Sequence, residues 1–174
     1  MLVKTVLNNC QKYKSFVFGK VKFITHNGSK TIEIEIHPRK NSKGICSGCH
    51  NPAPLYDKLK HRLFEHIPIW GFKVFFKYRM RRVECEDCGV TVEEVPWAEG
   101  KRELTKTYMH YLASWAKSLS WKEVAVKFHT SWEKVFHSVE YIINWGLNYH
   151  PQRRWLFKSL LNFILNNEYF YRRL

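Results

Sequence analysis

Alternation of apolar and polar residues predicts strands in the first forty residues. The segment from Phe16 to Ile24 is rich in β-branched and aromatic side chains, and isoleucines alternate with glutamates over residues 32–36. Between them, Asn27-Gly28 is a dipeptide typical of two-residue hairpin turns. We therefore expect a β-hairpin that ends at His37-Pro38 and is followed by a polar linker over residues 39–44.

A second alternating stretch covers residues 72–82. Its apolar residues, with the exception of Phe75, share one parity: Phe72, Val74, Phe76, Tyr78 and Met80. Basic residues share the other parity: Lys73, Lys77, Arg79 and Arg81. A strand with this pattern has one apolar face and one basic face.

Beyond Pro96 the spacing of apolar residues becomes helical. An apolar stripe predicts an amphipathic helix from about Leu104 to Lys117, through Tyr108, Tyr111, Leu112, Trp115 and Leu119. Two capping-box patterns follow, Ser120 to Glu123 and Thr130 to Glu133. They predict a short helix of about seven residues, a tight turn and a longer helix.

Two helices joined by a tight turn after a packing helix form the arrangement of a helix-turn-helix. Ala125 is the small residue where the helices cross, and His129 stands where most such turns have Gly, although His tolerates a left-handed backbone better than β-branched residues do. In that interpretation the second helix enters the major groove of DNA. Its candidate contact residues are Ser131, Glu133, Lys134, His137 and Ser138. The alternative is an ordinary three-helix bundle.

Four of the five cysteines form two CxxC pairs, Cys46 with Cys49 and Cys85 with Cys88. Two such knuckles place four sulfurs around one tetrahedral ion, so we expect one structural Zn²⁺. Gly48 and Gly89 are expected to supply the positive φ angles that fold each loop under the metal. The alternatives are two disulfides, which a reducing compartment disfavours, and a redox CxxC, which needs only one pair.

The net charge of +14 indicates a polyanionic partner. Residues 58–82 contain eight lysines and arginines and one acid, which gives +7, half of the excess. Most charge runs are solvated faces. Here the charges have one sign and share one face, so we expect contacts with DNA phosphates from Lys73, Lys77, Arg79, Arg81 and Arg82.

Composition excludes several classes of protein. With 45% hydrophobic and 16% aromatic residues, the chain can build packed cores, which argues against disorder. Neither a membrane-length apolar stretch nor a signal peptide is recognisable, so we expect a cytoplasmic protein without membrane contact. Only two aspartates occur, and the thirteen glutamates are scattered, so chemistry that needs clustered carboxylates for magnesium is disfavoured.

The order of these elements resembles the N-terminal region of bacterial insertion-sequence transposases of the ISL-three type. The resemblance covers roughly Ile45 to Tyr149 and rests on the two knuckles, the Ile67-Pro68-Ile69-Trp70-Gly71 turn, the basic strand and the Trp121–Ala125 helix. It implies that Cys46, Cys49, Cys85 and Cys88 bind zinc, that the helix from Ser131 is the recognition helix, and that the partner is duplex DNA of the terminal inverted repeats.

In that family a following domain with an Asp, Asp, Glu set performs strand transfer. Asp57 and Asp87 both precede the predicted helix-turn-helix, so this catalytic set cannot be assigned, and we expect a truncated transposase that is not an enzyme. Its protein partners would be a second copy or an intact transposase. A stand-alone transcription regulator and an RNA-binding zinc ribbon are the alternative functions.

The predicted fold class is α+β. It comprises an N-terminal β-hairpin region (1–40), a four-cysteine zinc ribbon (41–100), a three-helix helix-turn-helix domain (101–150) and a basic aromatic tail (151–174) in which a short helix is expected.

Overall fold

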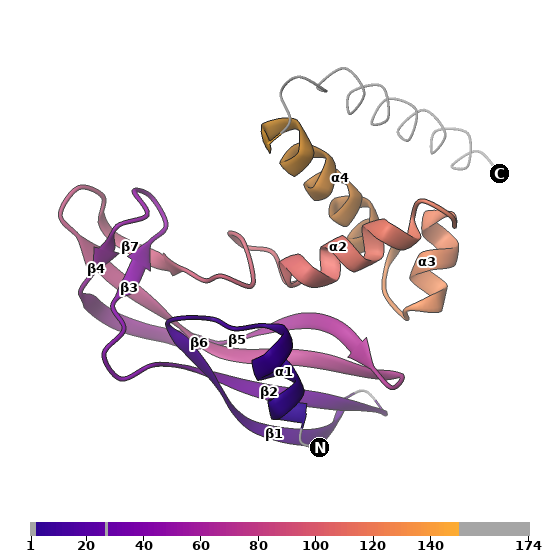
Figure 1. The fold of residues 1–174 in the computed structure, drawn as a ribbon, viewed down its shortest axis with the longest axis horizontal. Helices are drawn as coiled ribbons and strands as arrows, with labels where there is room; N and C mark the ends of the chain where they lie inside the picture. The colour runs from indigo at the N-terminus through magenta and orange to yellow at the C-terminus, as the bar shows by residue number, and fades with distance from the viewer. Residues whose placement is uncertain (1–2, 27, 150–174) are drawn as a thin grey trace. The chain divides into compact units, whose positions relative to one another are not determined.

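The computed structural model describes residues 3–26 and 28–149 (Figure 1). The chain divides into two compact units, Met1–Tyr108 and Met109–Leu174, and each is described by itself. The predicted tail at 151–174 lies outside the described residues, and the four-part division expected from the sequence stays a prediction. No helix in the described ranges is long and apolar enough to cross a membrane.

The first unit is built on a seven-stranded sheet with the order β1-β2-β6-β7-β3-β4, and β5 pairs with β6. One helix precedes the sheet, and the bounds of these elements are α1 (Val3–Cys10), β1 (Phe16–His26), β2 (Ser29–Pro38), β3 (Gly44–Cys46), β4 (Pro52–Ala53), β5 (Leu55–Ile69), β6 (Phe72–Cys85) and β7 (Gly89–Glu94). β1 and β2 form the predicted antiparallel hairpin. The chain is therefore a mixed α+β protein.

The long strand β6 organises this sheet. Its first half pairs in parallel with β2, where Ile34 lies opposite Phe76, and its end pairs with β7, where Cys85 lies opposite Gly89. Its other edge pairs with the fifteen-residue strand β5 through a two-residue turn. In that turn Trp70 and Gly71 have φ angles of +51° and +80°, as in type I′ turns.

The predicted apolar parity of β6 is confirmed, because Val74, Phe76, Tyr78 and Met80 are all buried. They belong to a core that also takes in isoleucines of β2, Leu7 of α1 and the segment after β7. Trp97 lies at its centre, with ring centroids 4.9 Å from Phe16, 5.1 Å from Tyr78 and 5.5 Å from Tyr13.

Three helices follow the sheet: α2 (Lys106–Trp115), α3 (Trp121–Lys127) and α4 (Trp132–Tyr149). The predicted stripe of α2 is buried at Tyr108 and Leu112, which are fully enclosed. α3 has the predicted length of seven residues and begins with the predicted capping box, in which Ser120 and Glu123 satisfy each other's backbone amides. The turn from α3 to α4 differs from the expectation in one detail.

That turn is a Schellman motif centred on His129. The His129 amide donates to the Val126 carbonyl at 3.2 Å, and the Thr130 amide donates to the Ala125 carbonyl at 2.9 Å. His129 has φ +50°, so a left-handed residue does stand at this position. The predicted capping box at Thr130 is wrong. Because the Schellman bonds engage Thr130, the hydroxyl that accepts the Lys134 amide, at 3.3 Å, belongs to Ser131.

Candidate metal centre and nucleic-acid interface

Each CxxC pair lies in a turn between two strands of the sheet. β3 ends at Cys46, and β6 ends at Cys85. In both knuckles the residue after the second cysteine has a positive φ, +61° at His50 and +70° at Gly89. The expectation for Gly89 is confirmed. Gly48 is not among the residues with a positive φ, because His50 makes the left-handed turn of the first knuckle.

Gly48 is needed for space. A Cβ atom at this position would lie 2.9 Å from the Cys88 sulfur and 3.7 Å from the Cys46 sulfur. Such a contact is too close for a side chain against a metal ligand. The first knuckle can therefore approach the sulfur of the second only because residue 48 is Gly.

The four sulfurs form one cluster. The Sγ atoms of Cys46, Cys49, Cys85 and Cys88 all lie within 4.8 Å of one another. The Sγ atoms of Cys49 and Cys85, which come from different knuckles, are 3.4 Å apart. Four sulfurs bound to one zinc at about 2.3 Å would be about 3.8 Å apart in a tetrahedron. The cluster therefore fits a single metal ion.

The electrostatics of the cluster also favour a cation. The Thr91 hydroxyl, together with the backbone amides of Cys49 and Gly48, lowers the pKa of the Cys46 thiol to about 6. Hydrogen bonding to Cys46 and burial raise the pKa of the Cys88 thiol to about 12. The first thiolate thus forms readily, but further negative charge needs a cation among the sulfurs. A four-thiolate donor set is one that Zn²⁺ prefers.

A buried carboxylate joins the ribbon to the main part of the sheet. The ribbon consists of β3, β4 and the adjoining ends of β6 and β7, which surround the four cysteines. Glu93 lies opposite Cys46 in the pairing of β3 with β7. Its carboxylate accepts hydrogen bonds from the Tyr78 hydroxyl at 2.6 Å and from Arg81 Nε at 2.8 Å. Because Glu93 and Arg81 are only 3% and 6% exposed, these contacts are shielded from water. Displacement of the ribbon would therefore disturb the position of Arg81.

The basic residues of β6 do not all lie on an open surface, although the sequence predicted that they would. Four of the five candidate residues form ion pairs with acids of neighbouring strands: Lys73 with Glu65 at 3.7 Å, Lys77 with Glu33 at 3.0 Å, Arg81 with Glu93 at 2.7 Å, and Arg82 with Asp57. Arg81 is buried, so it does not lie on an open surface. Arg79 is exposed, and its Nε atom donates to the Leu59 carbonyl at 3.0 Å. Alternation within one strand could not reveal these acids on other strands.

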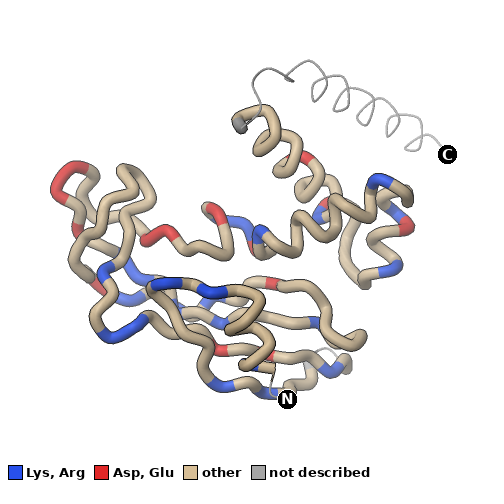
Figure 2. Tube along the Cα trace, viewed as in Figure 1, with Lys and Arg blue, Asp and Glu red and all other residues tan. Residues whose placement is uncertain are grey.

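The same part of β6 nevertheless forms the floor of a basic groove. A cavity of about 390 Å³ is bordered by the end of β2, the first half of β5 and the middle of β6, and Figure 2 shows lysine and arginine positions along these strands. Its basic lining residues are His37, Lys58, His61, Lys77, Arg79 and Arg81, and its single acid is Glu35. Sequence analysis missed His37, Lys58 and His61. Lys58 falls in the basic window of residues 58–82. However, only the pairing of β5 with β6 shows which residues of that window line the groove together with Arg79.

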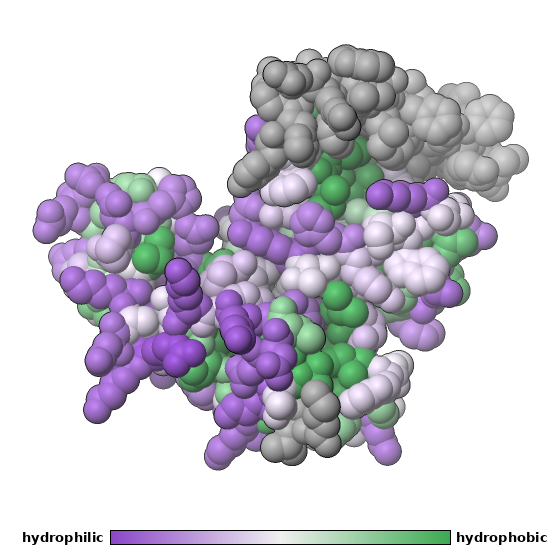
Figure 3. Space-filling view, viewed as in Figure 1, coloured by the Kyte–Doolittle hydropathy of each residue, from purple (hydrophilic) through white to green (hydrophobic). Residues whose placement is uncertain are grey.

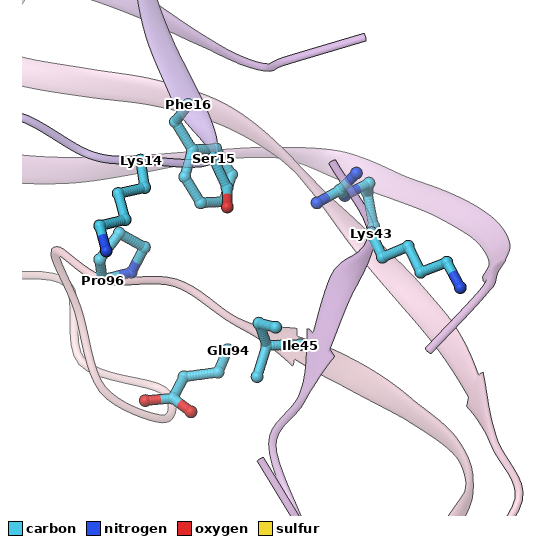
Figure 4. A pocket seen from close by; sticks show the side chains of 8 residues that line it. Lys14, Ser15, Phe16, Lys43, Ile45, Glu94 and Pro96 are labelled. Atoms are coloured by element: carbon cyan, nitrogen blue, oxygen red, sulfur yellow. The ribbon is translucent and has the colours of Figure 1, made fainter. Parts of the chain in front are cut away.

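A second cavity, of about 280 Å³, lies between the ribbon and the start of β1 (Figure 4). Lys14, Lys43 and Arg81 line it, but so does Glu94, and Phe16 and Pro96 contribute apolar walls. The Glu94 carboxylate also pairs with His50 at 2.7 Å. With three basic residues and one acid, this cavity is a poorer site for phosphate than the groove, which has six basic residues and one acid.

At the start of α4, the structure separates the five candidate contact residues. Ser131, Glu133 and His137 are exposed, and Lys134 is half-buried. Ser138 is fully buried, and its hydroxyl donates to the Lys134 carbonyl at 2.6 Å. Ser138 therefore does not face solvent, contrary to the expectation, because it lies one helical turn beyond Lys134 on the side that packs inward.

Comparison with known proteins identifies the segment that holds the cysteines. Residues 42–88 match the family described as the zinc-finger of transposase IS204/IS1001/IS1096/IS1165. This segment contains all four cysteines and the whole β5–β6 hairpin. No curated protein and no solved structure matches the chain.

Proposed function

We propose that this chain binds double-stranded DNA as the zinc-dependent end-recognition region of an insertion-sequence transposase. One observation carries the proposal. The segment that matches the transposase zinc-finger, residues 42–88, supplies both the four-cysteine cluster and five of the six basic residues of the groove. The four-cysteine cluster and most of the basic groove thus belong to one folded element.

In this proposal the groove holds the DNA backbone. Lysine and arginine contacts to phosphate release counterions, so they give affinity and register without reading sequence. Of the five β6 candidates, Arg79 is the exposed one, and its bond to the Leu59 carbonyl fixes the direction of its side chain. Zn²⁺, when bound, supplies structural stability to the ribbon.

We propose that α3 and α4 form a helix-turn-helix whose second helix reads base edges. Several features support this assignment: a seven-residue helix, a tight turn with a left-handed residue at His129, a buried Ala125 and a capped helix start at Ser131. Glu133 and His137 are exposed on the first turns of α4, where a recognition helix meets the bases. The target would be the terminal inverted repeats of the element.

We also propose that the chain binds DNA without cutting it. In the part of the chain that the structure describes, neither of its two aspartates lies in a cluster of carboxylates that could hold catalytic metal ions. Asp57 pairs with Arg82, which lowers the pKa of that carboxyl, and Asp87 lies between the two cysteines of the second knuckle. With purified protein, Mg²⁺ and duplex DNA carrying the repeats, we expect a shifted band and no strand cleavage.

The test is a binding titration of the zinc-loaded chain. Duplex DNA that carries the inverted repeats flanking the gene is compared with a shuffled duplex of equal length at several salt concentrations. We expect tighter binding to the repeats and a steep loss of affinity as salt rises. Equal affinity for both duplexes would contradict end recognition, and tighter binding to single-stranded RNA would favour the RNA-binding alternative.

A further inference from the structure

Basic residues gather in the loop that joins β2 to β3, next to the start of β1. Arg39, Lys40 and Lys43 lie in this loop, Lys14 lies just before β1, and all four are exposed. Lys14 and Lys43 line the second cavity from opposite sides (Figure 4). Figure 3 shows strongly hydrophilic residues over the ribbon and the adjoining end of the sheet. We call these four residues the loop cluster.

The charges of the loop cluster are not neutralised within the protein. Among the residues that the structure describes, no acid forms an ion pair with any of the four. The basic row of β6 differs, because four of its five cations pair with an acid of a neighbouring strand. Glu94 is the acid of the second cavity, and its carboxylate lies 2.7 Å from His50. Clustered charges of one sign without counter-charges attract a polyanion.

The loop is fixed in a β-turn over residues 39–42. The Ser42 amide donates to the Arg39 carbonyl at 3.0 Å, and the Ser42 hydroxyl donates to the same oxygen at 2.9 Å. The Arg39 amide donates to the Ser15 carbonyl at 2.8 Å, and Arg39 Nε donates to the Lys14 carbonyl at 2.8 Å. These bonds hold Arg39 beside Lys14 and place Lys40 at the tip of the turn. Because the backbone is already ordered, a partner meets these cations at a small entropic cost.

A buried arginine connects this loop to the ribbon. Arg81 Nη1 donates to the Ser42 carbonyl at 3.3 Å, and Arg81 Nε donates to the Glu93 carboxylate at 2.8 Å. Glu93 belongs to the ribbon strand β7. The ribbon thus supports the loop cluster through two buried side chains.

The loop cluster also adjoins the groove. Pro38 lines the groove, and Arg39 follows it directly in the chain. Arg81 lines both the groove and the second cavity. Duplex DNA carries one negative charge per about 1.7 Å of its axis, so a duplex held in the groove has further phosphates for residues beside it.

We propose that the loop cluster is a second contact with the DNA backbone, in addition to the groove. This inference rests on the proposed DNA binding and names residues that supply its affinity. Lys14, Arg39 and Lys40 lie outside residues 42–88, so most of the contact lies outside the segment that matches the transposase zinc-finger. Because these cations meet phosphates, the contact adds affinity and salt dependence without reading sequence.

The experiment measures how DNA affinity depends on salt for the zinc-loaded chain and a duplex of about 30 base pairs. One variant combines Lys14→Gln, Lys40→Gln and Lys43→Gln. A second variant has Arg at the same three positions and so keeps the charge. The control combines Lys30→Gln, Lys101→Gln and Lys117→Gln, which removes the same charge from other exposed positions. Since all these lysines are exposed, zinc content and unfolding temperature should match the wild type.

We expect the glutamine variant to lose about 2–3 from the slope of log affinity against log salt, because each lost phosphate contact removes about 0.9. Its affinity at low salt should fall by about 10-fold or more. The arginine variant should keep the slope and affinity of the wild type, and the control should change the slope by less than about 1.

Two outcomes would overturn the loop contact while DNA binding stands: equal slopes for the glutamine variant and the control, or an arginine variant as weak as the glutamine variant. Vesicles of phosphatidylglycerol give a third. If the glutamine variant lost binding to these vesicles but bound DNA as before, the loop cluster would be assigned to an anionic membrane surface. If the wild type bound no duplex at low salt, the proposed DNA binding itself would fail.

Discussion

The two ends of the main sheet are stabilised by different means. The ribbon end consists of strands of three and two residues, β3 and β4, beside the ends of β6 and β7, with a core cluster of four residues, two of which are cysteines. The remainder of the sheet encloses fourteen buried residues around Trp97. Because four side chains bury little apolar area, the ribbon must depend on its metal, whereas the rest of the sheet is stabilised by hydrophobic burial.

The dependence of the ribbon end on its metal also has a consequence for the proposed DNA binding. The groove is lined by residues of β2, β5 and β6, and it takes Arg81 from the junction of the two regions, where Glu93 joins the ribbon strand β7 to β6. If the groove binds DNA as proposed, binding should depend on the metal even though none of the four cysteines lines the groove. Four predictions test this comparison, and they are given in order of expected effect.

Loss of the metal should unfold the ribbon end alone. Cys85→Ser removes one thiolate, and the binding free energy of structural zinc is about 10–16 kcal/mol, so the knuckles should lose their order. Hydrogen exchange should show lost protection over residues 44–53 and 85–94, with protection retained over 16–38 and 64–78. Cys10→Ser, an exposed cysteine in α1, is the matched control. A Cys85→Ser variant that keeps one zinc equivalent and its protection would contradict the ligand assignment.

A substitution in the hydrophobic core should instead destabilise the rest of the sheet. Trp97→Ala removes a side chain that is 1% exposed and should lower the free energy of unfolding by about 3–5 kcal/mol. Denaturant unfolding measures this loss. Val126→Ala, at a position that is 75% exposed, should cost under about 0.5 kcal/mol. Equal costs for the two variants would show that the core is not organised around Trp97.

Acid should destabilise the part of the sheet that surrounds His66. This side chain is buried, its ring stacks on Phe76 with centroids 4.3 Å apart, and its Nδ1 atom pairs with the Thr105 hydroxyl at 2.9 Å. Burial lowers the pKa of His66 to about 4 from the ordinary 6.5. The unfolded chain therefore binds a proton first as the pH falls.

Stability that is complete above pH 6.5 should thus decline by about 3 kcal/mol between pH 6.5 and 4, and level off below. Denaturant unfolding at a series of pH values measures the slope. His66→Phe should flatten it, while His61→Gln, at an exposed position on the same strand, should leave it unchanged. An unaltered slope in His66→Phe would assign the acid sensitivity to other groups.

The smallest expected effects separate backbone contacts from base contacts. Arg79→Ala should weaken binding to all duplexes alike and reduce the salt slope by about 1, because one phosphate contact is lost. Lys134→Ala should weaken binding to the repeats by about 1–3 kcal/mol more than binding to shuffled DNA. Lys101→Ala, exposed and outside the groove, is the control. If Arg79→Ala and Lys134→Ala behaved identically, the proposed division of roles would be wrong.

Local sequence rules were sufficient for several local features, although they failed for the capping box at Thr130 and for the φ angle of Gly48. The β1–β2 hairpin, the capping box at Ser120 and the left-handed His129 all follow from neighbouring residues, and all were predicted. The four-cysteine cluster was also predictable, because the spacing within each CxxC pair and the chemistry of thiolates restrict the arrangement.

Contacts between distant segments were not predictable in the same way. The parallel pairing of β2 with β6 and the length of β5 depend on registers that no short motif encodes. Arg81 has the parity of an exposed residue but is buried because Glu93, on another strand, supplies its counter-charge. The groove residues His37 and His61 come together only through these pairings. Charge patterning thus indicated the basic strand but not which of its residues remain accessible.

The account depends most on the link between the metal and DNA binding. The direct measurement is the affinity of metal-free protein for a repeat-containing duplex as zinc is added stepwise. We expect weak binding without zinc and a rise that stops at one equivalent per chain, because one ion completes the cluster and fixes Glu93 and Arg81 beside the groove. Equal affinity with and without zinc, or saturation at another stoichiometry, would contradict the account.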